Sequence, residues 1–199
     1  MELRRFSLGT HIIAGAVAFI VFFIGVGLAW ASWPEWSPLE RTLSQLGEWF
    51  RDNGLSPYFF NGGCIVAGSL IAFGGLGKFL YEERLNKISG VFFMLAGISL
   101  MCVGIISGDY EIAHDTAAMV LFANMGLGTL LTTIADWKDG HLFVPISGLI
   151  ILIALLAQWP FLHEGLSECM PISGLLAWML VQVYKYHKIG EIGSGKVGE

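Results

Sequence analysis

Six long apolar segments limit what this chain can fold into more than any other feature of its sequence. They cover residues 12–31, 58–80, 88–107, 112–135, 142–159 and 169–186. Each is close to the roughly 20 residues with which an α-helix crosses the ~30 Å hydrocarbon core of a bilayer. The pattern predicts an all-α polytopic membrane protein, a bundle of six transmembrane helices that forms one domain over residues 1–188. Residues 189–199 are Gly-rich and polar and are predicted to form a disordered tail.

Positive charge is divided unequally between the two sides that these segments define. Of the 11 Lys and Arg residues, only Arg41 and Arg51 fall in connections on the outer side. Lys and Arg concentrate in the cytoplasmic connections of membrane proteins. We therefore expect both termini, including the tail, to lie in the cytoplasm.

The composition supports a membrane protein and argues against other classes. Charged residues make up 14% of the chain, compared with about 25% in soluble domains, and the mean hydropathy is +0.67. The net charge of −5 gives no basic footprint, so no nucleic-acid partner is expected. The 3 cysteines are widely spaced and predict neither a disulfide framework nor a zinc site.

The first outer connection, residues 32–57, is the longest and is rich in Trp and Pro. Trp suits the membrane interface, and Pro ends the preceding helix. Within this connection, residues 38–52 are expected to form a short amphipathic helix that lies on the outer surface. Its apolar face would carry Leu39, Leu43, Leu46 and Phe50.

Polar side chains gather at the outer ends of the second, third and fourth predicted helices, where a site could form. Glu111, His114 and Asp115 lie within five residues, at spacings that share one helix face. Histidine beside carboxylates suits general acid–base catalysis and also metal binding. The spacing matches no zinc signature, so no metal site is predicted.

The candidate residues have separate roles in the hypothesis. In a hydrolase, His114 would act as the base, Asp109 would orient it, and Ser44 or a water would attack the substrate. Ligand binding is assigned to Asn61, Arg41, Glu111 and Asp115. Two alternatives stay open for the histidine: a structural bond to a carbonyl or carboxylate, and metal ligation.

Within the spans, small and polar residues predict how the helices associate. Asn124 is the deepest strongly polar residue and is expected to bond across a helix interface. No Lys, Arg, Asp or Glu falls in the middle of a span, which argues against a proton-coupled pump. Close helix packing is expected at Gly63, Gly68, Gly74, Gly75, Gly77, Gly97, Gly104, Gly126 and Gly128.

Short motifs at the outer end resemble a known family. Ser44 and Gly47 in the first outer connection, Phe60 and Asn61 opening the second helix, and His114 opening the fourth carry the resemblance. The chain is similar over residues 12–137 to the prokaryotic six-helix membrane proteins grouped as domain of unknown function 998. More distantly, it resembles the eukaryotic Frag/DRAM/Sfk superfamily, whose acidic residue in this turn is replaced here by glutamine.

The resemblance implies a plasma-membrane protein and a link to membrane lipids, but no single reaction. Relatives in the eukaryotic superfamily are linked to lipid-anchor remodelling, phosphoinositide organisation and autophagy regulation. We therefore expect a lipid-handling protein, with a non-enzymatic scaffold or regulator as the alternative and a small transporter or channel as the weaker one. Membrane lipids are the expected partners, a homo-oligomer is compatible with the glycine-rich faces, and the sequence indicates no cofactor.

Overall fold

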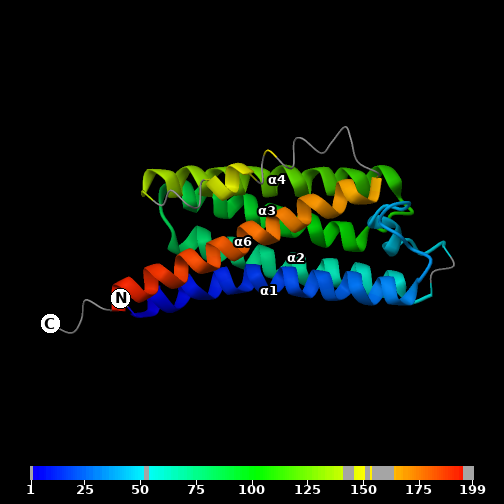
Figure 1. Ribbon diagram of the computed structural model, residues 1–199, viewed down its shortest axis with the longest axis horizontal. Helices are drawn as coiled ribbons and strands as arrows, with labels where there is room; N and C mark the ends of the chain where they lie inside the picture. The colour runs from blue at the N-terminus through cyan, green and yellow to red at the C-terminus, as the bar shows by residue number, and fades with distance from the viewer. Residues whose placement is uncertain (1, 52–53, 141–145, 151–152, 154–163, 195–199) are drawn as a thin grey trace.

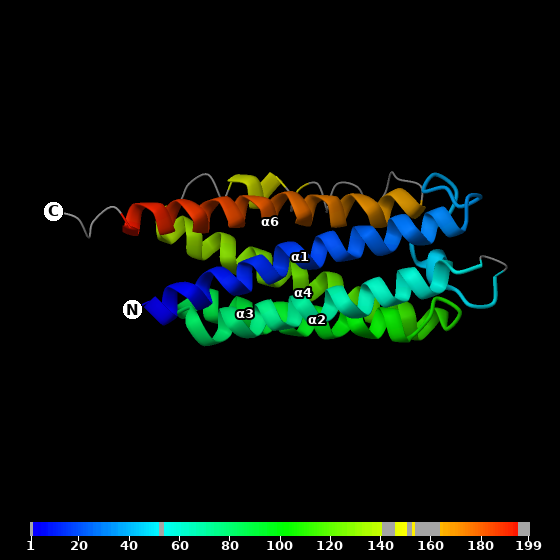
Figure 2. The same cartoon turned by 90° about the horizontal axis from the view of Figure 1, so that it is seen from below.

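The computed structural model describes residues 2–51, 54–140, 146–150, 153 and 164–194, and the elements within them are helical. The helices are α1 (Glu2–Ser32), the short 3₁₀ helix η1 (Ser44–Gly47), α2 (Ser56–Tyr81), α3 (Arg84–Ile105), α4 (Glu111–Lys138) and α6 (Glu164–Ser194). The long helices run lengthwise beside one another (Figures 1 and 2). This arrangement confirms the all-α class.

Four helices of the described chain are long and apolar enough to cross a membrane. They are Thr10–Ser32, Ser56–Tyr81, Arg84–Ile105 and Glu111–Lys138. Each corresponds to one of the first four predicted spans, and exposed side chains such as Ile20 and Phe73 on their outer faces suit contact with lipid. The fifth predicted span, residues 142–159, falls mostly outside the described residues.

The two ends of the bundle differ in what they contain. The start of α1, the α2–α3 connection and the end of α6 lie at one end, which we call the inner end (Figure 1). The long α1–α2 connection and the α3–α4 connection lie at the opposite, outer end (Figure 2). The α2–α3 and α3–α4 connections are short, so these helices run antiparallel to their neighbours.

Glycines bring α2 and α3 into close contact, as predicted. A Cβ added to Gly97 would lie 2.5 Å from the carbonyl oxygen of Gly68, and one added to Gly75 would lie 2.7 Å from that of Gly90. Real Cβ atoms do not approach backbone this closely, so larger residues would push the helices apart. Gly126 of α4 differs, because a Cβ there would meet nothing within 4 Å. The packing prediction is therefore wrong for that residue.

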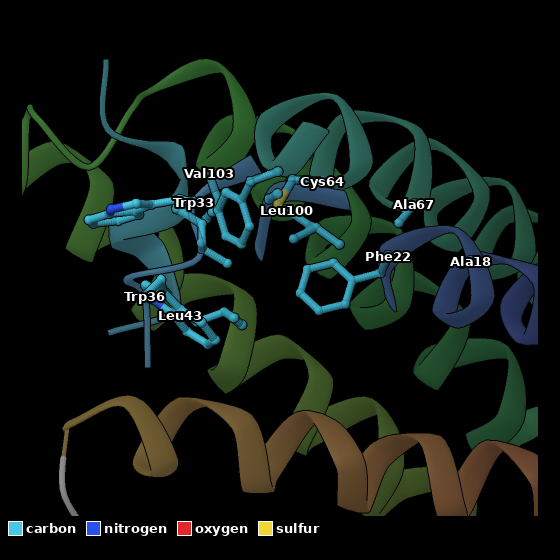
Figure 3. Packing of buried hydrophobic residues seen from close by; sticks show 12 residues of the cluster. Ala18, Phe22, Trp33, Trp36, Leu43, Cys64, Ala67, Leu100 and Val103 are labelled. Atoms are coloured by element: carbon cyan, nitrogen blue, oxygen red, sulfur yellow. The ribbon is translucent and has the colours of Figure 1, made fainter. Parts of the chain in front are cut away.

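An apolar cluster fills the outer end of the bundle. Trp33 and Leu43 of the α1–α2 connection fold over the helix ends and pack near Leu100 and Val103 of α3 (Figure 3). Trp36, also in that connection, is 3% exposed and donates its indole N–H to the carbonyl of Thr42 at 2.9 Å. The connection is therefore held on the bundle by buried indole rings.

The amphipathic helix expected over residues 38–52 is not what the structure shows. This segment contains only the single turn η1 among bends and turns. Leu43 and Leu46 are buried, whereas Leu39 and Phe50 are exposed, so the four do not share one apolar face. The reason is that several backbone N–H groups of this segment bond to carboxylates from elsewhere in the fold instead of to the segment's own carbonyls.

The predicted disordered tail is also corrected in part. The helix α6 continues to Ser194, so residues 189–194 are helical, and residues 195–199 lie outside the described chain. Asn124 gives a second correction, because its side-chain amide donates to the carbonyl of Val120 at 2.8 Å. This bond goes to its own helix one turn back, and not across a helix interface as expected.

Candidate functional site

Gly47 organises the backbone at the outer end. Its carbonyl oxygen accepts hydrogen bonds from the Asn61 amide at 3.0 Å and from the Ser107 hydroxyl at 2.9 Å. Ser56 donates to the neighbouring carbonyl of Leu46 at 2.9 Å. A Cβ at position 47 would lie 2.7 Å from the ring of Phe60, so only glycine fits here. The motif residues Gly47, Phe60 and Asn61 therefore form one structural unit.

Asp109 ties the α3–α4 connection to the α1–α2 connection. Its carboxylate accepts the backbone N–H groups of Trp49 at 2.6 Å and Phe50 at 3.2 Å, and a short hydrogen bond from the Ser107 hydroxyl. Burial acts to raise the pKa of Asp109, but these hydrogen bonds outweigh it and hold the pKa below its usual range. The carboxylate is therefore ionised and holds the backbone of the α1–α2 connection through hydrogen bonds.

Glu168 of α6 also binds backbone N–H groups of the α1–α2 connection. It accepts the backbone N–H groups of Leu43 at 2.7 Å and Ser44 at 3.3 Å, and it lies near enough to His114 for an electrostatic interaction. Glu168 falls with other polar residues in the last outer connection, but the hypothesis from the sequence gives it no role in the site. The available signal was its place one residue before the last predicted span, where an acid can reach a neighbouring connection.

The three residues predicted to be catalytic do not bond to one another within the described chain. His114 is buried, and its Nδ1 pairs with the carbonyl of Ile106 at 2.6 Å. The Ser44 hydroxyl pairs with the Thr42 hydroxyl at 2.9 Å, and Asp109 holds the loop backbone as described above. Each predicted catalytic residue therefore has a bond to a neighbouring loop or helix end.

The residues predicted to bind ligand are divided between the interior and the surface. Asn61 is buried, and its amide oxygen has no hydrogen-bond partner within the described structure. The guanidinium of Arg41 lies 4.8 Å from the centre of the Trp33 ring, whereas Glu111 and Asp115 are exposed. No group of three His, Cys, Asp or Glu side chains in the described chain is placed to hold a metal ion.

A second polar cluster lies at the inner end and was not predicted from the sequence. Asp136 of α4 is fully buried, forms an ion pair with Lys185, and accepts the Gln182 amide at 3.1 Å. Lys185 and Gln182 both come from α6. Beside them, Thr132 of α4 donates to Ser89 of α3 at 3.1 Å. Polar contacts therefore link α4 to α3 and α6 at this end.

Glu82 joins α1, α2 and α6 in the same region. The hydroxyl of Tyr186 donates to its carboxylate, and His11 Nε2 lies 3.7 Å from it. Burial acts to raise the pKa of Glu82, but the neighbouring His11, the positive charge of Lys78 and the hydrogen bond from Tyr186 lower that pKa to about 2. Glu82 is therefore ionised over the whole physiological range.

Two adjoining cavities lead from this inner cluster into the middle of the bundle. The inner cavity has a volume of about 40 Å³, and its polar lining comes from His11, Lys78, Trp178 and Gln182. The second, of about 50 Å³, is lined only by apolar side chains of α1, α2, α3, α4 and α6. The two share Phe19, Ile71 and Met125 as lining residues, so they adjoin each other, and the polar lining belongs to the inner one.

The four apolar spans and the polar ends that join them define a polytopic helical membrane protein. Residues 16–184 match the model of the family described as Protein of unknown function (DUF998), and the chain belongs to this family. The match confirms the resemblance to the domain of unknown function 998 family, whereas the more distant resemblance to the Frag/DRAM/Sfk superfamily stays a prediction. No curated protein matches the chain, and no solved structure matches it either.

Proposed function

We propose that this protein is a six-span plasma-membrane protein, with both termini in the cytoplasm, that binds an amphipathic lipid between its helices. The observation that carries the proposal is the apolar cavity of about 50 Å³ at mid-depth in the bundle. Each of the five long described helices contributes side chains to it, including Phe22 of α1 and Leu175 of α6. An apolar space at this depth suits a hydrocarbon chain, because polar solutes are costly to place there.

The contacts at the outer end favour binding over hydrolysis. His114, Asp109 and Ser44 are each bonded to a separate part of the loop structure, whereas a nucleophile and its base need mutual hydrogen-bond reach. None of the residues predicted for the outer site lines either of the two cavities. The lipid chain is therefore proposed to lie within the bundle, and the outer residues are proposed to hold the loops that cover the outer end of the bundle.

Lipid carried through purification tests the proposal. Wild type would be compared by native mass spectrometry with a variant that fills the apolar cavity, Ala18→Leu, since Ala18 is fully buried and lines the cavity. Ala123→Leu is the matched control, because Ala123 is exposed on α4. We expect a defined lipid on wild type and on the control, and a loss of more than half of it from Ala18→Leu.

A second cavity variant keeps the test valid if the first variant fails to fold. Ile172→Phe adds volume from α6 instead of α1, and thermal unfolding of each variant shows whether it is folded. If folded cavity variants retain the same lipid as wild type, or if wild type carries only a random lipid mixture, the proposed binding between the helices is wrong. Labelling of single cysteines placed in the predicted connections, from each side of the membrane, would test the six-span topology separately.

A further inference from the structure

A lysine residue with little exposed surface lies at the inner end of the bundle. The Lys78 residue of α2 is 4% exposed. No hydrogen bond or ion pair to its Nζ occurs in the described part of the chain, although Glu82 and Asp136 act on it electrostatically from farther away. An ammonium taken out of water without a hydrogen-bonding partner is costly. Its burial therefore calls for a partner.

The neighbouring carboxylates are already bonded to other groups. Asp136 pairs with Lys185 and also receives the Gln182 amide. Glu82 receives the hydroxyl of Tyr186 and lies beside His11. Neither carboxylate forms a direct bond to the ammonium of α2. An acceptor from outside the chain can supply that bond.

The cavity beside Lys78 contains two further polar atoms without partners. The indole N–H of Trp178 is buried and makes no hydrogen bond within the described structure, and neither does the side-chain oxygen of Gln182. The ammonium and the indole are both donors and suit an oxyanion. The Gln182 oxygen is an acceptor and suits a water. A volume of about 40 Å³ gives room for roughly three water-sized groups, which matches the two oxygens of a carboxylate and one water.

The path behind this cavity is apolar. Phe19, Ile71 and Met125 line both the inner cavity and the apolar cavity beyond it. A group bound at Lys78 can therefore direct a hydrocarbon chain toward the middle of the bundle. By the same measure the apolar cavity of about 50 Å³ has room for roughly four chain carbons, so the rest of a longer chain must extend beyond it. Free oxyanions such as acetate or phosphate share the polar chemistry but would leave the apolar space unused.

We propose that Lys78 and Trp178 bind the carboxylate of a fatty-acid-like amphiphile at the inner end, with part of its chain in the apolar cavity. The inference rests on the proposed function and adds the headgroup class and its position. It places the headgroup at the end of the bundle opposite to the polar residues that the sequence pointed to.

Binding of three probes to the purified full-length protein tests the inference. The probes are hexadecanoate, hexadecanol, which has the same chain without the charge, and acetate, which has the charge without the chain. We expect hexadecanoate to bind at least tenfold more tightly than hexadecanol, since a hydrogen bond to a charged group contributes about that much. Lys78→Met should reduce hexadecanoate binding to the level of hexadecanol, and millimolar acetate should not displace hexadecanoate.

Two further variants keep the result interpretable. Trp178→Phe removes the N–H donor but keeps an aromatic ring, and should weaken hexadecanoate binding severalfold without changing hexadecanol binding. Lys138→Met is the matched control, because Lys138 is exposed at the same end of the bundle, and should bind like wild type. Thermal unfolding of Lys78→Met and Trp178→Phe beside wild type shows whether each variant is folded before its binding is compared.

The outcomes separate this inference from the proposed function. Equal binding of hexadecanoate and hexadecanol, or unchanged hexadecanoate binding by Lys78→Met, would overturn the carboxylate site and leave chain binding standing. Displacement by acetate at equal affinity would overturn the amphiphile as the ligand and assign the pocket to a free carboxylate. Failure of both long-chain probes to bind would overturn the proposed function as well.

Discussion

The buried ion pair between Lys185 and Asp136 gives the sharpest test of how the inner end is held together. The Asp136 residue is 0% exposed and the Lys185 residue is 9% exposed. Replacing Lys185 with methionine leaves a buried carboxylate whose remaining hydrogen bond in the described structure comes from the Gln182 amide. The variant should be strongly destabilised, because a buried charge loses its counter-ion while the burial remains.

The size of the effect follows from the cost of breaking a buried pair. Removal of one partner costs about 3–5 kcal/mol, whereas replacing both partners with apolar groups is close to neutral or stabilising. We therefore expect Lys185→Met to lower the free energy of unfolding by about 3 kcal/mol, and the double variant Lys185→Met/Asp136→Leu to recover most of that loss. For a chain of this size, about 3 kcal/mol corresponds to roughly 6–12 °C in the unfolding midpoint.

Thermal unfolding in a single detergent, followed by circular dichroism, measures these differences. Lys138→Met serves as the control for removal of a lysine at the same end, and it should change stability by less than about 0.5 kcal/mol because Lys138 is exposed. The reasoning fails if Lys185→Met is as stable as that control. It also fails if the double variant is as unstable as the single one, since the pair would then not be coupled.

Three further predictions follow from other parts of the fold. Gly97→Ala should lower the unfolding midpoint, because its Cβ would meet the backbone of α2. Gly126→Ala has open space around it and should raise stability by up to about 1 kcal/mol through helix propensity. Equal effects of the two variants in a melting experiment would contradict the close packing. Because the pKa of Glu82 is lowered to about 2, its stabilising contribution is complete above its ordinary pKa of about 4.5 and is lost as the pH falls toward 2. Glu82→Gln should therefore show a smaller drop in unfolding midpoint between pH 6 and pH 3 than wild type, and an unchanged drop would refute this. Arg84 has φ of 51°, a left-handed conformation that glycine adopts more easily. Arg84→Gly should therefore have an unfolding midpoint no lower than that of wild type. A lower midpoint would show that the contacts of the arginine side chain outweigh the backbone strain.

The sequence correctly predicted the helices that are defined by the length of an apolar segment. The first four spans match helices of the described chain, and the glycine pairs of α2 and α3 lie at the close contacts that were expected. These features depend on local composition and on spacing within one helix. They are therefore visible without knowledge of how distant segments meet.

The outer connection shows where local patterns fail. Leu39, Leu43, Leu46 and Phe50 have helical spacing, yet two of them are buried and two are exposed. The backbone there is bound by Asp109 and Glu168, which lie far away in sequence. No pattern within residues 38–52 could reveal that these carboxylates compete for the N–H groups a helix needs.

The inner cluster was missed for a related reason. Lys78, Asp136 and Lys185 lie near the ends of their helices, and charges at helix ends are ordinarily solvated in the connections. The structure buries them because α6 lies against α1 and brings Gln182 and Lys185 over Asp136. The signal that could have been used is the spacing of Gln182, Lys185 and Tyr186, which places three polar groups on one face of a single helix.

The central claim is that a hydrocarbon chain lies between the helices, and photo-crosslinking tests it most directly. Hexadecanoic acid with a diazirine in its chain would be bound to the full-length wild-type protein, irradiated, and the labelled residues identified by peptide mass spectrometry. The account predicts labels on residues that line the apolar cavity, such as Phe19, Phe22 and Ile172. Labels confined to the exposed face of the same helix, at Ile20 and Phe23, would show that the chain contacts only the outside of the bundle and would contradict the account.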